Sequence, residues 1–157
     1  MCAPRHTIRS SVDDMLPDPL APLPSTKRVD PRRTLGQLGE ELAVAHVRRL
    51  GYSVLGRNER TRYGEIDLIA FDTRTLVFAE VKTRRISAHA KHVRPDQEPL
   101  TWLRPRQRIR LRRLAVAWLH DEQHIRPTAH TIRFDAIGVI LDTNNRLVRL
   151  DHIEGAW

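Results

Sequence analysis

Two short apolar segments, residues 65–71 and 76–84, constrain the fold of this chain more than any other feature of its 157 residues. Both have the length of a β-strand, and only the turn-forming sequence Asp-Thr-Arg-Thr separates them. So short a link predicts two neighbouring antiparallel strands. The second segment is apolar on both faces in its first half, which is typical of a central strand covered by helices on both sides.

Helices and strands are also expected on either side of this pair. Leucine and alanine at helical spacing predict a helix that begins at an N-cap, Thr34, and ends at Gly51. A second helix begins at Pro105, since proline suits a first helical turn, and ends near His120. The other expected segments are strands at 52–57, 131–141 and 147–153, loops at 58–63 and 85–104, and a turn at 142–145.

This order of elements predicts an α/β fold. Short links make the first three strands an antiparallel meander, and the second helix is long enough for a crossover that returns a parallel strand. The result is a mixed central sheet flanked by helices, with one more strand at the C-terminus. Residues 1–33 contain six of the ten prolines, so they are expected to form a flexible tail before a domain at 34–157.

The charge indicates a polyanionic partner. The chain has 27 Lys and Arg against 19 Asp and Glu, which gives a net charge of +8. One cysteine excludes an internal disulfide, and no secretory or membrane-spanning segment is recognisable, so a cytoplasmic protein without a membrane partner is expected.

A carboxylate site is predicted across the two central strands. Glu80 and Lys82 project to one face of their strand, and Asp67 lies on the neighbouring strand. Such a pair of carboxylates could share Mg²⁺ (or Mn²⁺), with a lysine beside it to orient a water molecule. Glu65 lies on the same face as Asp67 by strand alternation and could assist. The alternative is a partly buried ion-pair cluster that only holds the strands together.

The chain resembles the YraN-like family of uncharacterised bacterial proteins, and more broadly the PD-(D/E)xK nuclease superfamily. The resemblance covers about residues 34–157. The matching stretches are GQLGEELA (36–43), LGYSVLGRNER (50–60), GEIDLIA (64–70), LVFAEVKTR (76–84), LAVAWL (114–119), RFDAIGV (133–139) and HIEGAW (152–157).

The resemblance implies a restriction endonuclease-like αβββαβ core and a role with nucleic acid. By position, Asp67 and Glu80 would be the metal ligands, Lys82 the catalytic lysine and Glu40 the helix glutamate that often completes the site. Three features depart from the pattern. Ile66 replaces a proline, the loop at 87–94 has no glycine, and the second helix starts with Arg106 and Gln107 in place of a lysine.

The basic excess is local. Residues 82–113 hold 11 basic and 2 acidic side chains, so this stretch is a candidate phosphate-binding flank. On the second helix Arg106, Arg110 and Arg113 share a side. The full set of expected nucleic-acid-binding residues is Arg60, Arg62, Arg84, Arg85, Arg106, Arg110 and Arg113.

The sequence therefore predicts a metal-dependent nuclease, with DNA favoured over RNA, branched DNA a candidate substrate, and a homodimer left open. Two alternatives remain. One is a non-catalytic nucleic-acid-binding protein on a nuclease fold, and the other is a protein-interaction scaffold.

Overall fold

The computed structural model describes residues 31–90, 92–101, 105–122 and 126–156. Of the tail expected at residues 1–33, residues 1–30 therefore lie outside the described residues. The elements are α1 (Pro31–Arg49), β1 (Ser53–Thr61), β2 (Gly64–Phe71), β3 (Thr75–Arg85), the 3₁₀ helix η2 (Pro95–Gln97), α2 (Pro105–His120), β4 (Thr131–Leu141) and β5 (Leu147–Ile153).

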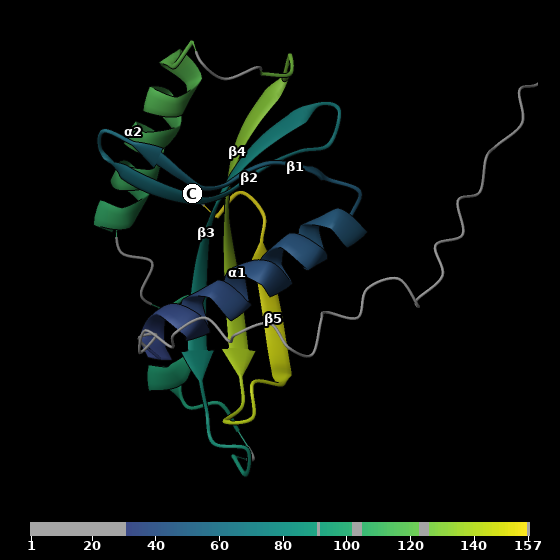
Figure 1. The fold of residues 1–157 in the computed structure, drawn as a ribbon, viewed down its shortest axis with the longest axis vertical. Helices are drawn as coiled ribbons and strands as arrows, with labels where there is room; N and C mark the ends of the chain where they lie inside the picture. Colours follow the sequence, from purple (N-terminus) through teal and green to yellow (C-terminus); the bar gives the residue numbers. More distant parts are fainter. Residues whose placement is uncertain (1–30, 91, 102–104, 123–125, 157) are drawn as a thin grey trace, which may run out of the picture.

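The five strands form one mixed sheet in the order β1-β2-β3-β4-β5 (Figure 1). Strands β1, β2 and β3 pair antiparallel, as the short links predicted. Strand β4 pairs with β3 in parallel along its whole length, from Thr75↔Thr131 to Arg85↔Leu141. Because α2 lies between β3 and β4 in the chain, the predicted helical crossover and the α/β fold class are confirmed.

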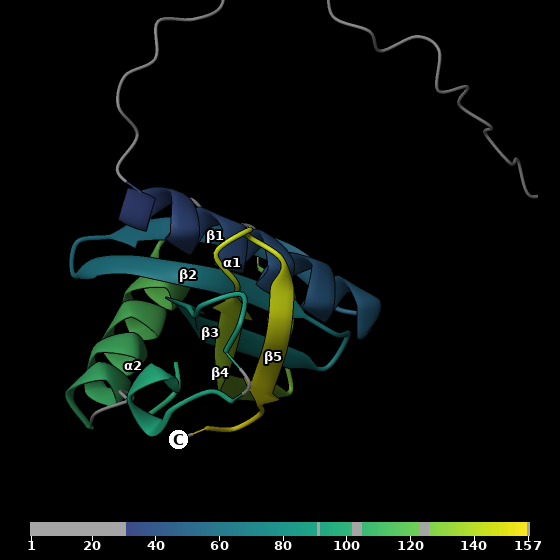
Figure 2. The same cartoon turned by 90° about the horizontal axis from the view of Figure 1, so that it is seen from below.

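The two helices cover opposite faces of the sheet (Figures 1 and 2). Helix α1 packs its Ala43, Val44 and Val47 on a cluster that includes Val77, Ala79 and Val81 of β3. Helix α2 packs Leu111, Leu114 and Trp118 on the other face, where Phe78 is fully buried. Strand β3 is therefore covered on both sides, which explains its run of apolar residues.

Two predicted boundaries near the N-terminus are wrong. Helix α1 begins at Pro31 and not after an N-cap at Thr34, because proline lacks only an N–H that has no partner in a first turn. The predicted loop at 58–63 is mostly strand, since β1 continues to Thr61 and pairs there with Gly64. Its polar composition reflects a solvent-exposed hairpin at the sheet edge.

The expected loop at 85–104 is shorter and better anchored than its polar sequence indicated. Strand β3 extends to Arg85, and η2 forms within the loop. Pro99 is buried against Gly138 of β4, where an added Cβ would lie 2.7 Å from the proline ring. Glu98 also forms an ion pair with Arg149 of β5. The described part of the loop therefore packs on β4 and β5.

Within the described ranges, neither helix is long and apolar enough to cross a membrane.

Candidate active site

The predicted site lies where β2 and β3 separate. Their backbone pairing ends at Leu68↔Ala79, so Asp67 and Glu80 are the first residues beyond it. Instead of a backbone carbonyl of β2, the Asp67 side chain accepts the hydrogen bond of the Val81 backbone N–H, with Oδ2 2.7 Å from N. A carboxylate thus bridges the two strands at the point where the sheet opens.

The opening coincides with a break in the side-chain alternation of β2. Ile66 packs in the α2-side core, whereas Leu68 packs in the α1-side core, although residues two apart on a regular strand share a face. The Asp67 side chain reaches β3, where it accepts the Val81 N–H. Glu65, predicted on the Asp67 face by regular alternation, lines hollows with Arg60 and Arg110.

Glu80 and Lys82 follow on β3 and form an ion pair with each other. The Glu80 side chain is 13 % exposed and that of Lys82 34 % exposed. A carboxylate this buried is costly unless it is paired, so Lys82 offsets much of the desolvation of Glu80. The lysine remains accessible enough to reach a bound molecule.

The electrostatics of Asp67 show that this opening concentrates negative charge. Burial, and next the charge of Glu80, raise the pKa of the Asp67 carboxyl to about 7. The Val81 N–H and the charge of Lys82 act in the opposite direction but do not cancel the rise. A carboxyl whose pKa is raised by burial and by a neighbouring carboxylate is typical of functional sites.

Glu40 on α1 also contributes to this charge, since it too raises the pKa of Asp67. Its Oε2 accepts a hydrogen bond from Asn58 Nδ2 of β1 at 2.9 Å. The preceding Gly39 lets α1 approach β3 closely, because an added Cβ would lie 1.8 Å from Thr83 Oγ1. Close packing of α1 on β3 therefore brings the third carboxylate to the opening.

Asp67 and Glu80 are the residues of this arrangement that could hold a divalent ion. Across the described ranges, no three His, Cys, Asp or Glu side chains gather closely enough to form a metal-binding cluster. Asp67 and Glu80 alone would be its protein ligands, which suits Mg²⁺ because this ion usually keeps several waters and one or two carboxylates. Burial and the charge of Glu80 both disfavour the ionised form of Asp67, and a bound cation would offset this effect.

Two hollows border the opening, and arginines line both. One, of about 610 Å³, lies between α1 and β3 and is lined by Glu40, Thr83, Arg84 and Arg85, among others. The other, of about 480 Å³, lies between α1 and the β1–β2 hairpin and includes Glu40, Arg60 and Glu65. Arg85 also donates a hydrogen bond to Asn145 in the β4–β5 turn, at 2.6 Å.

The three arginines predicted to share a side of α2 are all exposed. Arg106 is in the first turn. Arg110 lies over Gly64, where an added Cβ would be 2.8 Å from its guanidinium. Arg113 lies against the ring of Tyr63, 5.5 Å from the ring centroid, and Arg62 lies 4.7 Å from the same centroid.

Sequence reasoning missed a second polar cluster, away from the opening. Asp135 of β4 is fully buried and accepts hydrogen bonds from Arg133, His152 and the Gly155 backbone N–H. Burial alone would raise its pKa, but these hydrogen bonds lower the pKa overall. His152 also contacts His46 of α1 at 3.2 Å. The only sequence signal was that RFDAIGV and HIEGAW both belong to the family resemblance.

The hydrogen bonds of this cluster link the C-terminal segment to β4 and α1. Its donors saturate the buried carboxylate, so we assign it to stability and not to chemistry.

Comparisons with known proteins confirm the resemblance at the level of the family. The chain is 43% identical over 133 residues to a UPF0102 protein of Acidothermus cellulolyticus, which covers 80% of this chain and 95% of the relative. It is 38% identical over 130 residues to a UPF0102 protein of Nocardia farcinica, and the match covers 83% of this chain and 94% of the relative. It is 41% identical over 135 residues to one of Mycobacterium tuberculosis, covering 83% and 98%. Residues 39–139 match the uncharacterised protein family UPF0102, and the chain belongs to that family.

Proposed function

We propose that this protein is a metal-dependent nuclease that hydrolyses phosphodiester bonds of nucleic acid, built on the restriction endonuclease-like core of the PD-(D/E)xK superfamily. The α/β order, the mixed sheet and the helices on its two faces are consistent with that core. The family match covers the segments that carry Asp67, Glu80, Lys82 and Glu40.

One observation carries the proposal: Asp67 crosses from β2 to bind the Val81 N–H, between Glu80 and Lys82. If Asp67 only linked β2 to β3, it would need no other charged side chains around it. Here burial, and next the charges of Glu80 and Glu40, raise the pKa of Asp67 to about 7, although Lys82 acts in the opposite direction. Proteins do not usually keep such an unfavourable group at the mouth of a sheet without a functional reason.

The chain's own residues would divide the work as follows. Asp67 and Glu80 would hold the ion, which when bound supplies Lewis-acid stabilisation of charge on the phosphate. Lys82 Nζ, partly exposed and next to Glu80, would orient the attacking water and offset charge on the scissile phosphate. Arginine would be a poor substitute for Lys82, because it does not give up a proton in proteins. Glu40, held by Asn58, would fix the position of the incoming water or phosphate.

The test is cleavage of branched, flapped and linear DNA, and of RNA, with Mg²⁺ or Mn²⁺. We expect Asp67→Ala and Lys82→Ala to lower the cleavage rate at least about 100-fold, as loss of a transition-state contact does. Glu41→Ala, an exposed carboxylate next to Glu40, is the matched control and should cleave like the wild type. Circular dichroism melts show whether each variant is folded. Equal cleavage by the wild type and both site variants would contradict the proposal.

A non-catalytic nucleic-acid-binding protein is the second candidate. It is favoured by the arginine-lined hollows beside α1. It predicts salt-sensitive binding that is the same with Mg²⁺ and with EDTA, and no cleavage of any substrate.

A further inference from the structure

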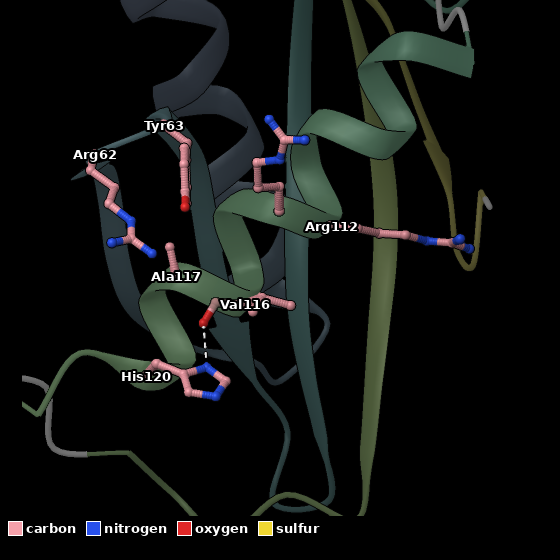
Figure 3. A pocket seen from close by; sticks show the side chains of 7 residues that line it. Arg62, Tyr63, Arg112, Val116, Ala117 and His120 are labelled. Atoms are coloured by element: carbon pink, nitrogen blue, oxygen red, sulfur yellow. Dashed lines mark hydrogen bonds between the residues drawn. The ribbon is translucent and has the colours of Figure 1, made fainter.

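A hollow of about 490 Å³ lies between the β1–β2 turn and the last turns of α2 (Figure 3). We name it the Tyr63 pocket. The turn contributes Arg62 and Tyr63, and α2 contributes Arg113, Val116, Ala117 and His120. The seventh lining residue, Arg112, points away in Figure 3 and lies over Phe134, 5.9 Å from the ring centroid. None of the seven is acidic, so the pocket suits an anionic ligand.

The centre of the pocket is an exposed aromatic ring. Tyr63 is 43% exposed and stands between Arg62 and α2, with Ala117 nearby in Figure 3. Guanidinium groups of Arg62 and Arg113 lie over the ring. A cation–π contact at an exposed site is worth about 0.5–1 kcal/mol, whereas stacking of a base on an aromatic side chain is worth about 1–3 kcal/mol. A base can therefore displace a guanidinium from the ring, and the freed arginine stays close enough to bind the adjacent phosphate.

The rest of the pocket matches a flat, partly polar ring. Val116 is 54% exposed, although it is a large apolar residue, and would contact one edge of a base. His120 donates its Nδ1–H to the Val116 carbonyl at 2.8 Å, which leaves Nε2 as a hydrogen-bond acceptor in the neutral ring. The pocket thus combines an aromatic face, an apolar edge, one acceptor and two guanidinium groups.

Hollows that share lining residues connect this pocket to the candidate active site. A further hollow continues the Tyr63 pocket; its lining residues are Thr61, Arg62, Ala117, His120 and the acidic Asp121. Thr61 then lines the next hollow together with Gly64, Arg60, Glu65 and Arg110.

The last step of the path returns to the sheet opening. Arg60 and Glu65 also line the hollow that contains Glu40. The path follows the β1–β2 hairpin, and an arginine occurs in each hollow along it.

We propose that the Tyr63 pocket binds an unpaired base of a single-stranded stretch of nucleic acid, so that the substrate class carries a flap, a fork arm or an overhang beside the cleaved bond. A base inside a duplex is covered on both faces and cannot reach the Tyr63 ring, whereas an unpaired base can. Naming the substrate class in this way rests on the proposed nuclease function. The binding claim itself concerns only the pocket.

The test is binding in EDTA, so that no cleavage is needed. A fluorescein-labelled forked DNA with two single-stranded arms is compared with a blunt duplex of the same paired length. We expect the wild type to prefer the fork. Tyr63→Ala should weaken binding of the fork about 5- to 150-fold, the range expected for loss of one stacking contact, and should leave binding of the blunt duplex unchanged. Tyr63→Phe keeps the ring and should keep the preference. A 2-aminopurine in the arm should be quenched by the wild type and not by Tyr63→Ala.

Arg74→Ala is the control for charge, since it removes one cation from the exposed turn at the other end of β2. Equal weakening of fork and duplex by Tyr63→Ala, or no weakening, would overturn the proposal. A shift of oligomeric state in Tyr63→Ala with unchanged fork binding would also overturn it, because the pocket would then be a protein contact. If the fork preference depends on Tyr63 but no substrate is cleaved, the proposed nuclease function fails and the base pocket stands. If cleavage depends on Asp67 but the fork preference is absent, the base pocket fails and the proposed nuclease function stands.

Discussion

Asp67 has opposite effects on stability and on the proposed activity. In the folded protein the pKa of its carboxyl is about 7, whereas an unperturbed aspartate titrates near 3.8. Between these two values the folded state holds a proton that the unfolded state has released. Stability of the metal-free protein therefore falls as pH rises from about 4 to about 7, and this loss is complete above the folded-state pKa.

We expect Asp67→Asn to be more stable than the wild type in EDTA, with a larger advantage at pH 8 than at pH 5. The asparagine Oδ1 can still accept the Val81 N–H, and the uncompensated charge is gone. A gain of about 1 kcal/mol or more corresponds to ~2–4 °C in Tm for a domain of this size. Thermal melts at the two pH values measure it. Glu41→Gln makes the same change of charge at an exposed position and should show no such pH dependence. A lower Tm for Asp67→Asn at pH 8 would contradict the assignment of charge repulsion at the opening.

At the scale of elements, the distance between α1 and β3 decides whether Glu40 can reach the sheet opening. Gly39 has no room for a side chain, because an added Cβ would meet Thr83 Oγ1 at 1.8 Å and Thr83 Cβ at 2.9 Å. Three residues earlier, an added Cβ on Gly36 would meet only Glu40 Oε1, at 3.9 Å. The two glycines thus form a matched pair within one helix.

Gly39→Ala should destabilise the protein by about 1–3 kcal/mol, since it forces α1 away from β3. It should also weaken cleavage, because Glu40 moves with the helix. Gly36→Ala should be neutral, or stabilising by up to about 1 kcal/mol through helix propensity. Chemical denaturation gives both free energies of unfolding. Equal stability of the two variants would show that α1 can shift without cost and that the close approach does not position Glu40.

Some elements of the fold could be predicted from the sequence and others could not. The apolar run of β3, the short turn before it and the length of α2 were sufficient to predict strand order and orientation, because these depend on periodicity and connection length. The extent of β1 was not predictable, since an exposed hairpin and a loop have the same polar composition. The opening at Asp67 was not predictable either. A regular strand would place the side chains of Ile66 and Leu68 on the same face. Only tertiary packing places them in different cores.

At the scale of the whole molecule, the net charge of +8 matters through its position. Arginines of β1, of its turn and of α2 lie along the path from the sheet opening to the Tyr63 pocket. Arg48 and Arg49 lie in the last turn of α1, far along the helix from Glu40. A partner attracted by net charge alone would not distinguish these two groups of arginines, whereas a partner that follows the path would.

The salt dependence of DNA binding separates these cases. Each phosphate contact on B-DNA contributes about −0.9 to the slope of log K against log salt. Arg60→Gln combined with Arg110→Gln should therefore reduce the magnitude of the slope by about 1.8, which makes the affinity lost between 50 and 200 mM salt roughly tenfold smaller. Arg48→Gln combined with Arg49→Gln lowers the net charge by the same amount and should leave the slope nearly unchanged. Fluorescence anisotropy over a salt series in EDTA measures both slopes. If the two double variants lose equal amounts of slope, the basic excess acts as a diffuse charge, and the hollows along the β1–β2 hairpin do not guide the strand.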